Sequence, residues 1–289
     1  MIDYRGLQAL AMVIEHGGFE RAARHLFITQ SAVSQRVKHL EALIGQPVLM
    51  RTTPPKATAM GQRLHSHWQQ VRLLEAGLGI ASTPNQLTVR LTVNADSLAT
   101  WLPEALVLPD HPNVSFDLLV EDQAVGLRRM RQGEVMACLC ASAEPVNGGR
   151  VAFLGYLRYR AVASPEFIAN YGLKDLSRLP DAPCLVFNRD DPLQHEFLAT
   201  VVGGTPQRIH YCPSSEGFVE ATRVGLGYGM IPELQFRDLL ASGELVDVVP
   251  GYALSTPLYW HYWQTESDVM LNLRTQVIKI AKQRLLAEA

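Results

Sequence analysis

The sequence predicts an α/β protein with a small helical N-terminal region, one long helix and a larger region of alternating strands and helices. Apolar residues recur at three- and four-residue spacing through the first 45 positions. The same spacing then runs unbroken over about 20 residues from Thr58, which predicts a single long helix. From residue 87 onward, short apolar runs are separated by helical segments, the pattern of parallel sheets covered by helices.

The composition is that of a globular protein with more than one domain. A chain of 289 residues exceeds one hydrophobic core, and 47% hydrophobic with 19% charged residues argues against disorder. We find neither a continuous apolar run of membrane-spanning length nor a signal-peptide pattern at the N-terminus. The four cysteines include only one close pair, Cys138 and Cys140, which indicates free thiols in a reducing compartment. We therefore expect a cytoplasmic protein without a membrane partner.

The charge is unevenly divided along the chain. Residues 1–80 contain nine of the 26 Lys and Arg and five of the 28 Asp and Glu, a net charge of +4. The remainder carries −6, which gives the overall −2. This asymmetry predicts that the first region meets a polyanion and the second does not.

Three helices are expected in the first 45 residues. Asp3 can cap a helix over Tyr4–His16, and a second helix follows over Phe19–Leu26. Thr29 can cap a third over Gln30–Ile44, which the glycine at position 45 ends. A short helix, a tight turn and a second helix is the helix-turn-helix arrangement.

The third helix has one apolar and one polar face. The apolar stripe consists of Val33, Val37, Leu40 and Ile44. The opposite face has no carboxylate and carries Ser31, Ser34, Gln35 and Lys38, with Arg36 beside them. Hydroxyls, amides and cations are donors for phosphates and base edges, although an ordinary amphipathic helix with a neutral outer face fits the same pattern.

The segment FERAARHLFITQSAVSQRVKHLEALIGQPVLMR (19–51) resembles the DNA-binding domain of LysR-type transcriptional regulators. The resemblance includes the paired Ala22 and Ala23, the QSAVSQ start of the recognition helix, and Gly61 beyond the wing. Leu49 stands where the family usually has Phe, an apolar exchange. The resemblance implies a winged helix-turn-helix domain over residues 1–58 and double-stranded DNA as a partner, with RNA polymerase as a further candidate.

The resemblance and the polar face together give eight candidate DNA-binding residues. Nearest the bases we expect Gln30, Ser31, Ser34 and Gln35. Phosphate contacts are expected from Arg36 and Lys38, and wing contacts to the backbone or minor groove from Arg51 and Lys56.

The long helix and a hinge are expected over residues 59–86. Its apolar stripe can pack on its own domain or pair with the same helix of a second chain, and the resemblance favours pairing. The chain would then be a dimer or a dimer of dimers. The candidate dimerisation residues are Leu64, Trp68, Val71, Leu74 and Leu78.

The region 87–289 resembles the effector-binding domain of the same family, similar to periplasmic binding proteins. We expect lobe I over about 87–160 plus 264–289 and lobe II over about 161–263. Crossovers near Arg160 and Trp260–Trp263 would leave the ligand between the lobes. Ligands of open α/β sheets bind beyond the carboxyl ends of strands, where helix N-termini present free N–H groups.

Ten residues at those strand ends are candidate effector contacts. They are Asp96, Ser97, Thr100, Asp122, Ser142, Asn188, Asp190, Ser214, Ser215 and Glu216. Ser97 and Thr100 can bind a carboxylate, while the acids suit a cation. Each acid taken singly can also be a helix cap or a solvent-exposed group.

Several segments (VNADSLATWLPEAL, LLVED, TTPPK, SSEGFV and LYWH) resemble the branch of the family that responds to lysine or arginine and controls genes such as basic-amino-acid exporters. Asp122 stands where the wider family often has Gly, which makes it the first candidate for a ligand ammonium. We expect no cofactor, no metal and no enzyme, because G-x-S-x-G, H-E-x-x-H and GxxxxGK[ST] are missing from the sequence. The competing interpretation is a small-molecule-binding protein or enzyme whose helix-turn-helix only dimerises it.

Overall fold

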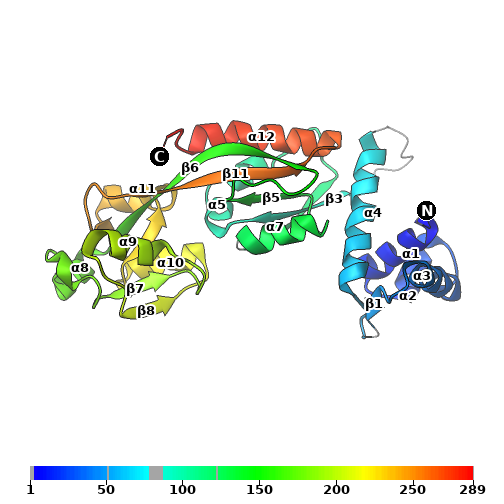
Figure 1. Ribbon diagram of the computed structural model, residues 1–289, viewed down its shortest axis with the longest axis horizontal. Coiled ribbons are helices and arrows are strands. Elements are labelled where there is room, and N and C mark those ends of the chain that lie inside the picture. The colour runs from blue at the N-terminus through cyan, green and yellow to red at the C-terminus, as the bar shows by residue number, and fades with distance from the viewer. Residues whose placement is uncertain (1–2, 51, 78–86, 122, 289) are drawn as a thin grey trace.

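The computed structural model describes residues 3–50, 52–77, 87–121 and 123–288. Figure 1 shows three parts in chain order: a helical N-terminal domain at one end, the long helix α4, and an α/β region of two lobes. This is the predicted α/β architecture, with a helix-turn-helix domain, a linker helix and a two-lobed region.

The N-terminal domain folds around three short helices whose bounds are those predicted. They are α1 (Tyr4–His16), α2 (Phe19–Leu26) and α3 (Gln30–Ile44). The Asp3 and Thr29 side chains accept hydrogen bonds from main-chain N–H groups in the first turns of α1 and α3. The stripe of α3 packs into the core of this domain, where Val33, Val37 and Leu40 are buried.

A two-stranded hairpin, β1 (Leu49–Met50) and β2 (Lys56–Ala57), forms the wing after α3. The Glu41 carboxylate accepts from the Val48 N–H at 2.8 Å, which joins α3 to the start of the wing. The long helix α4 (Ala59–Gly77) follows, and a Cβ at its Gly61 would overlap the Val48 carbonyl. Only glycine therefore permits this close approach of α4 to the wing.

Lobe I is a five-stranded mixed sheet with helices on both faces. The parallel strands β4, β3 and β5 are followed in the sheet by the antiparallel β11 and β6. Helix α12 shares the main core with one face of the sheet, and α7 packs on the other face against Cys138 and Cys140. The bounds are β3 (Leu87–Val93), α5 (Ala95–Ala99), α6 (Leu102–Ala105), β4 (Val114–Val120), α7 (Gln123–Arg131), β5 (Ala137–Cys140), β6 (Gly149–Ala163), β11 (Leu254–Trp263) and α12 (Asp268–Arg284).

Lobe II is built on the far end of β6, which pairs there with β9 and β10, and on the parallel pair β7 and β8. The bounds are α8 (Pro165–Tyr171), η1 (Leu176–Arg178), β7 (Pro183–Val186), α9 (Leu193–Val202), β8 (Arg208–Tyr211), α10 (Ser215–Arg223), β9 (Gly229–Pro232), α11 (Glu233–Ser242) and β10 (Val246–Asp247).

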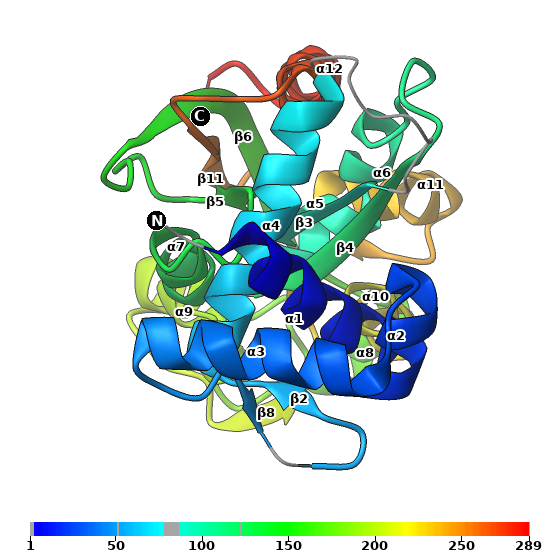
Figure 2. The ribbon, with the colours of Figure 1, turned by 90° about the vertical axis from the view of Figure 1, so that its right-hand side faces the viewer.

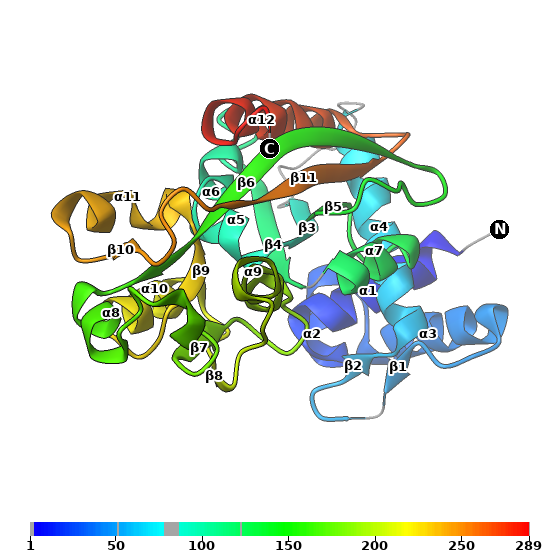
Figure 3. The ribbon, with the colours of Figure 1, turned by 60° about the vertical axis from the view of Figure 1, so that its left-hand side comes forward.

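Two long strands, β6 and β11, connect the lobes (Figures 1 and 3). Arg160 lies in β6 where its pairing changes from β11 to β9, as predicted for the first crossover. The second passage lies near Leu254, earlier than the predicted Trp260–Trp263. The predicted position is wrong because residues 259–262 pair with β5 and so already belong to lobe I.

Candidate DNA interface and inter-lobe cavity

The polar face of α3 lies on the surface of the N-terminal domain. Its exposed side chains are Gln30, Ser31, Gln35 and Lys38, while Ser34 and Arg36 are half-buried. Figure 2 shows α3 and the β1–β2 hairpin at the same end of the molecule, where Lys56 is exposed on the wing. Arg51 lies outside the described residues. The other seven candidates thus share one outward-facing end, the arrangement that a helix entering a major groove requires.

A cavity of about 610 Å³ lies between the lobes, within the range of small-molecule sites. Lobe I contributes the start of α5 and the ends of β4 and β5, and lobe II contributes the loop from β7 to α9. The crossover strand β11 supplies Ser255–Leu258. Five carboxylates line the cavity, namely Asp96, Glu121, Asp190, Asp191 and Glu196. Among the described residues that line it, none is Lys or Arg.

Asp96 is half-buried and has hydrogen-bond partners in both lobes. Its Oδ2 accepts from the Tyr159 hydroxyl at 2.7 Å, and its Oδ1 accepts from the Ser215 hydroxyl at 2.9 Å. Burial raises the pKa of the Asp96 carboxyl, and the two hydrogen bonds only partly oppose that rise. Since Ser215 belongs to α10, Asp96 also links lobe I to lobe II.

The other four acids are held in different ways. Asp191 accepts from the main-chain N–H groups of Phe187 and Leu193 at 3.1 and 3.0 Å. Glu121 pairs with Arg129 at 2.6 Å. Within the part of the chain that the structure describes, no ion pair involves Asp190 or Glu196, and both side chains are exposed. The cavity thus keeps negative charge available for a cation.

Of the ten predicted effector contacts, Asp96, Asn188 and Asp190 line this cavity. Ser215 reaches it through Asp96, and Asp122 lies outside the described residues. The prediction that Ser97 and Thr100 face a ligand carboxylate does not fit the structure. Ser97 is fully buried, and the Thr100 hydroxyl donates to the Asp96 carbonyl at 2.6 Å.

Three further candidates lie away from the lining. Ser142 accepts from the Glu144 N–H, Ser214 caps α10 through the Gly217 N–H, and Glu216 is exposed beside it. Ser142 and Ser214 thus accept from local main-chain N–H groups, and the exposed Glu216 fits the solvent-exposed alternative that the sequence left open for each acid.

Sequence reasoning missed Glu121, Glu196, Ser255 and Thr256. Glu121 directly precedes the predicted Asp122, and an acid at the end of a strand was the available signal. Ser255 and Thr256 come from the crossover strand, which was placed several residues too late. No local pattern marked Glu196, because α9 brings it to the cavity only through the packing of lobe II.

The candidate dimerisation residues divide between two environments on α4. Leu64 is only 6% exposed and packs in the core of its own domain, where Trp68 also packs. Leu64 is therefore not available to a second chain. Leu74 is 43% exposed, Val71 is half-buried, and Leu78 lies outside the described residues.

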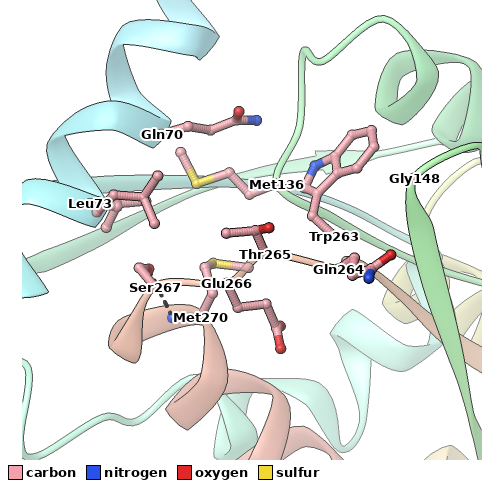
Figure 4. A pocket seen from close by; sticks show the side chains of 11 residues that line it. Gln70, Leu73, Met136, Gly148, Trp263, Gln264, Thr265, Glu266, Ser267 and Met270 are labelled. Carbon is pink, nitrogen blue, oxygen red and sulfur yellow. Dashed lines mark hydrogen bonds between the residues drawn. The ribbon is translucent and has the colours of Figure 1, made fainter.

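A second cavity, of about 420 Å³, lies between the second half of α4 and lobe I. Figure 4 shows Leu73, Met136 and Met270 around it, with the Trp263 ring on the far side. Leu74 also lines it. The lobe I side of this cavity is mixed, with Gln264, Thr265, Glu266 and Ser267 beside the apolar Met136, Trp263 and Met270.

Comparison with known proteins identifies the family to which this architecture belongs. Residues 4–62 match the family described as bacterial regulatory helix-turn-helix protein, lysR family, and residues 82–275 match the LysR substrate binding domain. The chain belongs to the LysR family. LysR-type regulators are transcriptional regulators that bind DNA and small-molecule effectors, so the alternative of an enzyme is set aside.

Individual LysR-type relatives show which branch of the family this chain resembles. ArgP of Pseudomonas fluorescens is 48% identical, covering 99% of this chain and 98% of its own, and ArgP of Photobacterium profundum is 42% identical with 98% of each covered. The crystal structure of ArgP from Mycobacterium tuberculosis matches with a TM-score of 0.82 at 35% identity over 100% of both chains. LysG of Corynebacterium glutamicum with bound effector Arg matches with a TM-score of 0.72 at 33% identity, covering 98% and 99%. This LysR-type regulator is therefore of the ArgP- and LysG-like branch. None of its described helices is both long and apolar enough to cross a membrane.

Proposed function

We propose that this regulator binds L-arginine or L-lysine between its lobes and that the bound amino acid changes its action at promoters of amino-acid export or metabolism genes. The observation that carries the proposal is the cavity lining, which contains five carboxylates and, among the described residues, no Lys or Arg. One of the five, Glu121, pairs with Arg129, which lies outside that lining. A ligand with net positive charge is the one that such a lining attracts. The arginine bound to LysG supports the same ligand class.

The lining provides a partner for each charged group of a basic amino acid. Asp190 and Glu196, which are exposed and outside any ion pair of the described residues, suit the side-chain cation. The hydroxyls of Ser255 and Thr256 on β11 can donate to the ligand carboxylate, and Asp96 can accept from its α-ammonium. Asp122 remains a candidate from the sequence.

Isothermal calorimetry on the full chain tests the ligand class. We expect arginine and lysine to bind and citrulline, the neutral isostere of arginine, to bind at least tenfold more weakly. A charge-assisted hydrogen bond contributes about 1.5–3 kcal/mol, and 1.4 kcal/mol is about tenfold. Equal affinity for citrulline would show that the acids do not recognise a cation.

A pair of variants locates the binding. Glu196→Gln should weaken arginine binding by about tenfold, by the loss of one charge-assisted partner. Glu166→Gln is the matched control, because Glu166 is an exposed acid in the first turn of α8 and lies outside the cavity lining. If both variants weaken binding alike, the effect is one of overall charge and the proposed site is wrong.

A further inference from the structure

Arg129 in α7 connects an acid that lines the cavity with an acid in the turn that follows α7. Its Nε and Nη2 both donate to Oε1 of Glu121, at 2.9 and 2.6 Å, and its Nη1 donates to Oε2 of Glu134 at 2.8 Å. The three side chains are 13–33% exposed, so these ion pairs are partly shielded from water. One guanidinium thus bridges two carboxylates in fixed geometry.

Glu134 in turn contacts the linker helix. Its main-chain N–H donates to the Arg129 carbonyl at 2.9 Å, and its own carbonyl accepts from the Ser66 hydroxyl at 3.2 Å. Ser66 is only 6% exposed at this contact between α4 and lobe I, and Figure 3 shows α7 beside α4. Arg129 therefore positions Glu134 through both its side chain and its main chain, and Glu134 in turn accepts the hydrogen bond from Ser66.

The path continues into the DNA-binding domain. His65, directly before Ser66 in α4, and Gln69, about one turn after it, contact the carboxylate of Glu15 at 3.1 and 3.0 Å. Glu15 belongs to α1, which packs on α3. Contacts thus lead from the cavity lining through Glu134 to α4, and from α4 through Glu15 to the domain that carries the recognition helix.

We propose that the cationic group of the effector competes with Arg129 for Glu121 and that Arg129 thereby transmits occupancy of the cavity to the linker helix α4. This inference rests on the proposed function. Both Arg129 contacts use Oε1, and no described residue donates to the Glu121 Oε2, so a ligand can approach the same carboxylate. Two cations on one carboxylate repel each other, which displaces Arg129 and loosens its hold on Glu134.

Arg129→Gln tests the competition. The variant removes a cation from beside the ligand, so arginine should bind to the full chain as tightly as to wild type or several-fold more tightly in calorimetry. Arginine should no longer change the affinity for an operator selected from random DNA by the wild-type protein. Arg128→Gln is the matched control, because Arg128 is exposed on the same helix, and it should keep both the wild-type affinity and the response.

Ser66→Ala tests the second half of the path. It should leave arginine affinity unchanged and reduce the DNA response, and the double variant Ser66→Ala/Arg129→Gln should lose no more response than Arg129→Gln alone. Additive losses, a full response in Arg129→Gln, or a loss of arginine affinity in that variant would each overturn the proposal.

A measurement without effector distinguishes failure of the proposed function from failure of this structural path. If wild type binds neither arginine nor lysine, hydrogen exchange of the effector-free proteins still tests whether Arg129 is coupled to α4. Amides of α4 should exchange faster in Arg129→Gln than in Arg128→Gln or wild type. Equal rates in all three proteins would overturn the coupling of Arg129 to α4.

Discussion

At the scale of single residues, Asp96 is an acid whose ionised form the surrounding structure disfavours. It is a half-buried acid in a cavity lined by four other acids, and its desolvation raises its pKa. Because the folded-state pKa exceeds the unfolded one, ionised Asp96 destabilises the effector-free fold, and protonation relieves that cost. In the proposed binding mode a ligand cation would relieve this cost as well, and the same carboxylate would then both lower the stability of the effector-free fold and bind the ligand.

Asp96→Asn should therefore stabilise the effector-free protein, and the gain should depend on pH. We expect Tm to rise at pH 7, because the amide carries no charge for the half-buried site to disfavour. The gain should shrink as the pH falls through the raised pKa and vanish near pH 4, the ordinary carboxyl value. Thermal denaturation across this range measures it, with the exposed Asp181→Asn as control. A gain that grows toward low pH would contradict the assignment.

At the scale of elements, α3 carries the prediction about DNA. Ser34 and Gln35 lie on its polar face near the N-terminal end, so Ser34→Ala with Gln35→Ala should weaken binding to the specific operator by about 1–3 kcal/mol for each lost base contact. Binding to unrelated DNA should change little, because phosphate contacts supply it. Leu43→Ala is the control on the same helix, since Leu43 is exposed near its other end. Equal losses on both DNAs in fluorescence anisotropy would make the two side chains phosphate contacts or fold residues.

Elements with local start and stop signals could be predicted from the sequence. Capping residues and glycine stops gave α1 and α3 their bounds, because both signals act within one turn. The site was only partly predictable. The sequence marked Asp96 and Asn188 at strand ends, but the direction of Ser97 depends on how the five-residue α5 sits on the sheet. The contribution of β11 depended on where a long strand changes partners, which no local pattern encodes.

At the scale of the whole molecule, α4 has two partners. Its first half packs on the N-terminal domain through Leu64, and its second half faces lobe I, where Leu73 is buried. A single apolar stripe at helical spacing could not reveal this division, because both halves show the same periodicity. We propose that self-association uses the second half, around the exposed Leu74, and that the full chain is at least a dimer.

Two substitutions on α4 separate assembly from folding. Leu74→Asp should convert the assembly to monomers in sedimentation equilibrium while the N-terminal domain stays folded, because it places a charge in the seam but not in a core. Leu64→Asp should instead destabilise the N-terminal domain by about 2–5 kcal/mol, as expected when a buried leucine is lost and a charge enters its place. Leu271→Asp is the control, since Leu271 is 45% exposed on α12. Leu74→Asp remaining a dimer at about 10 μM, where modest interfaces persist, would remove this part of α4 from the interface.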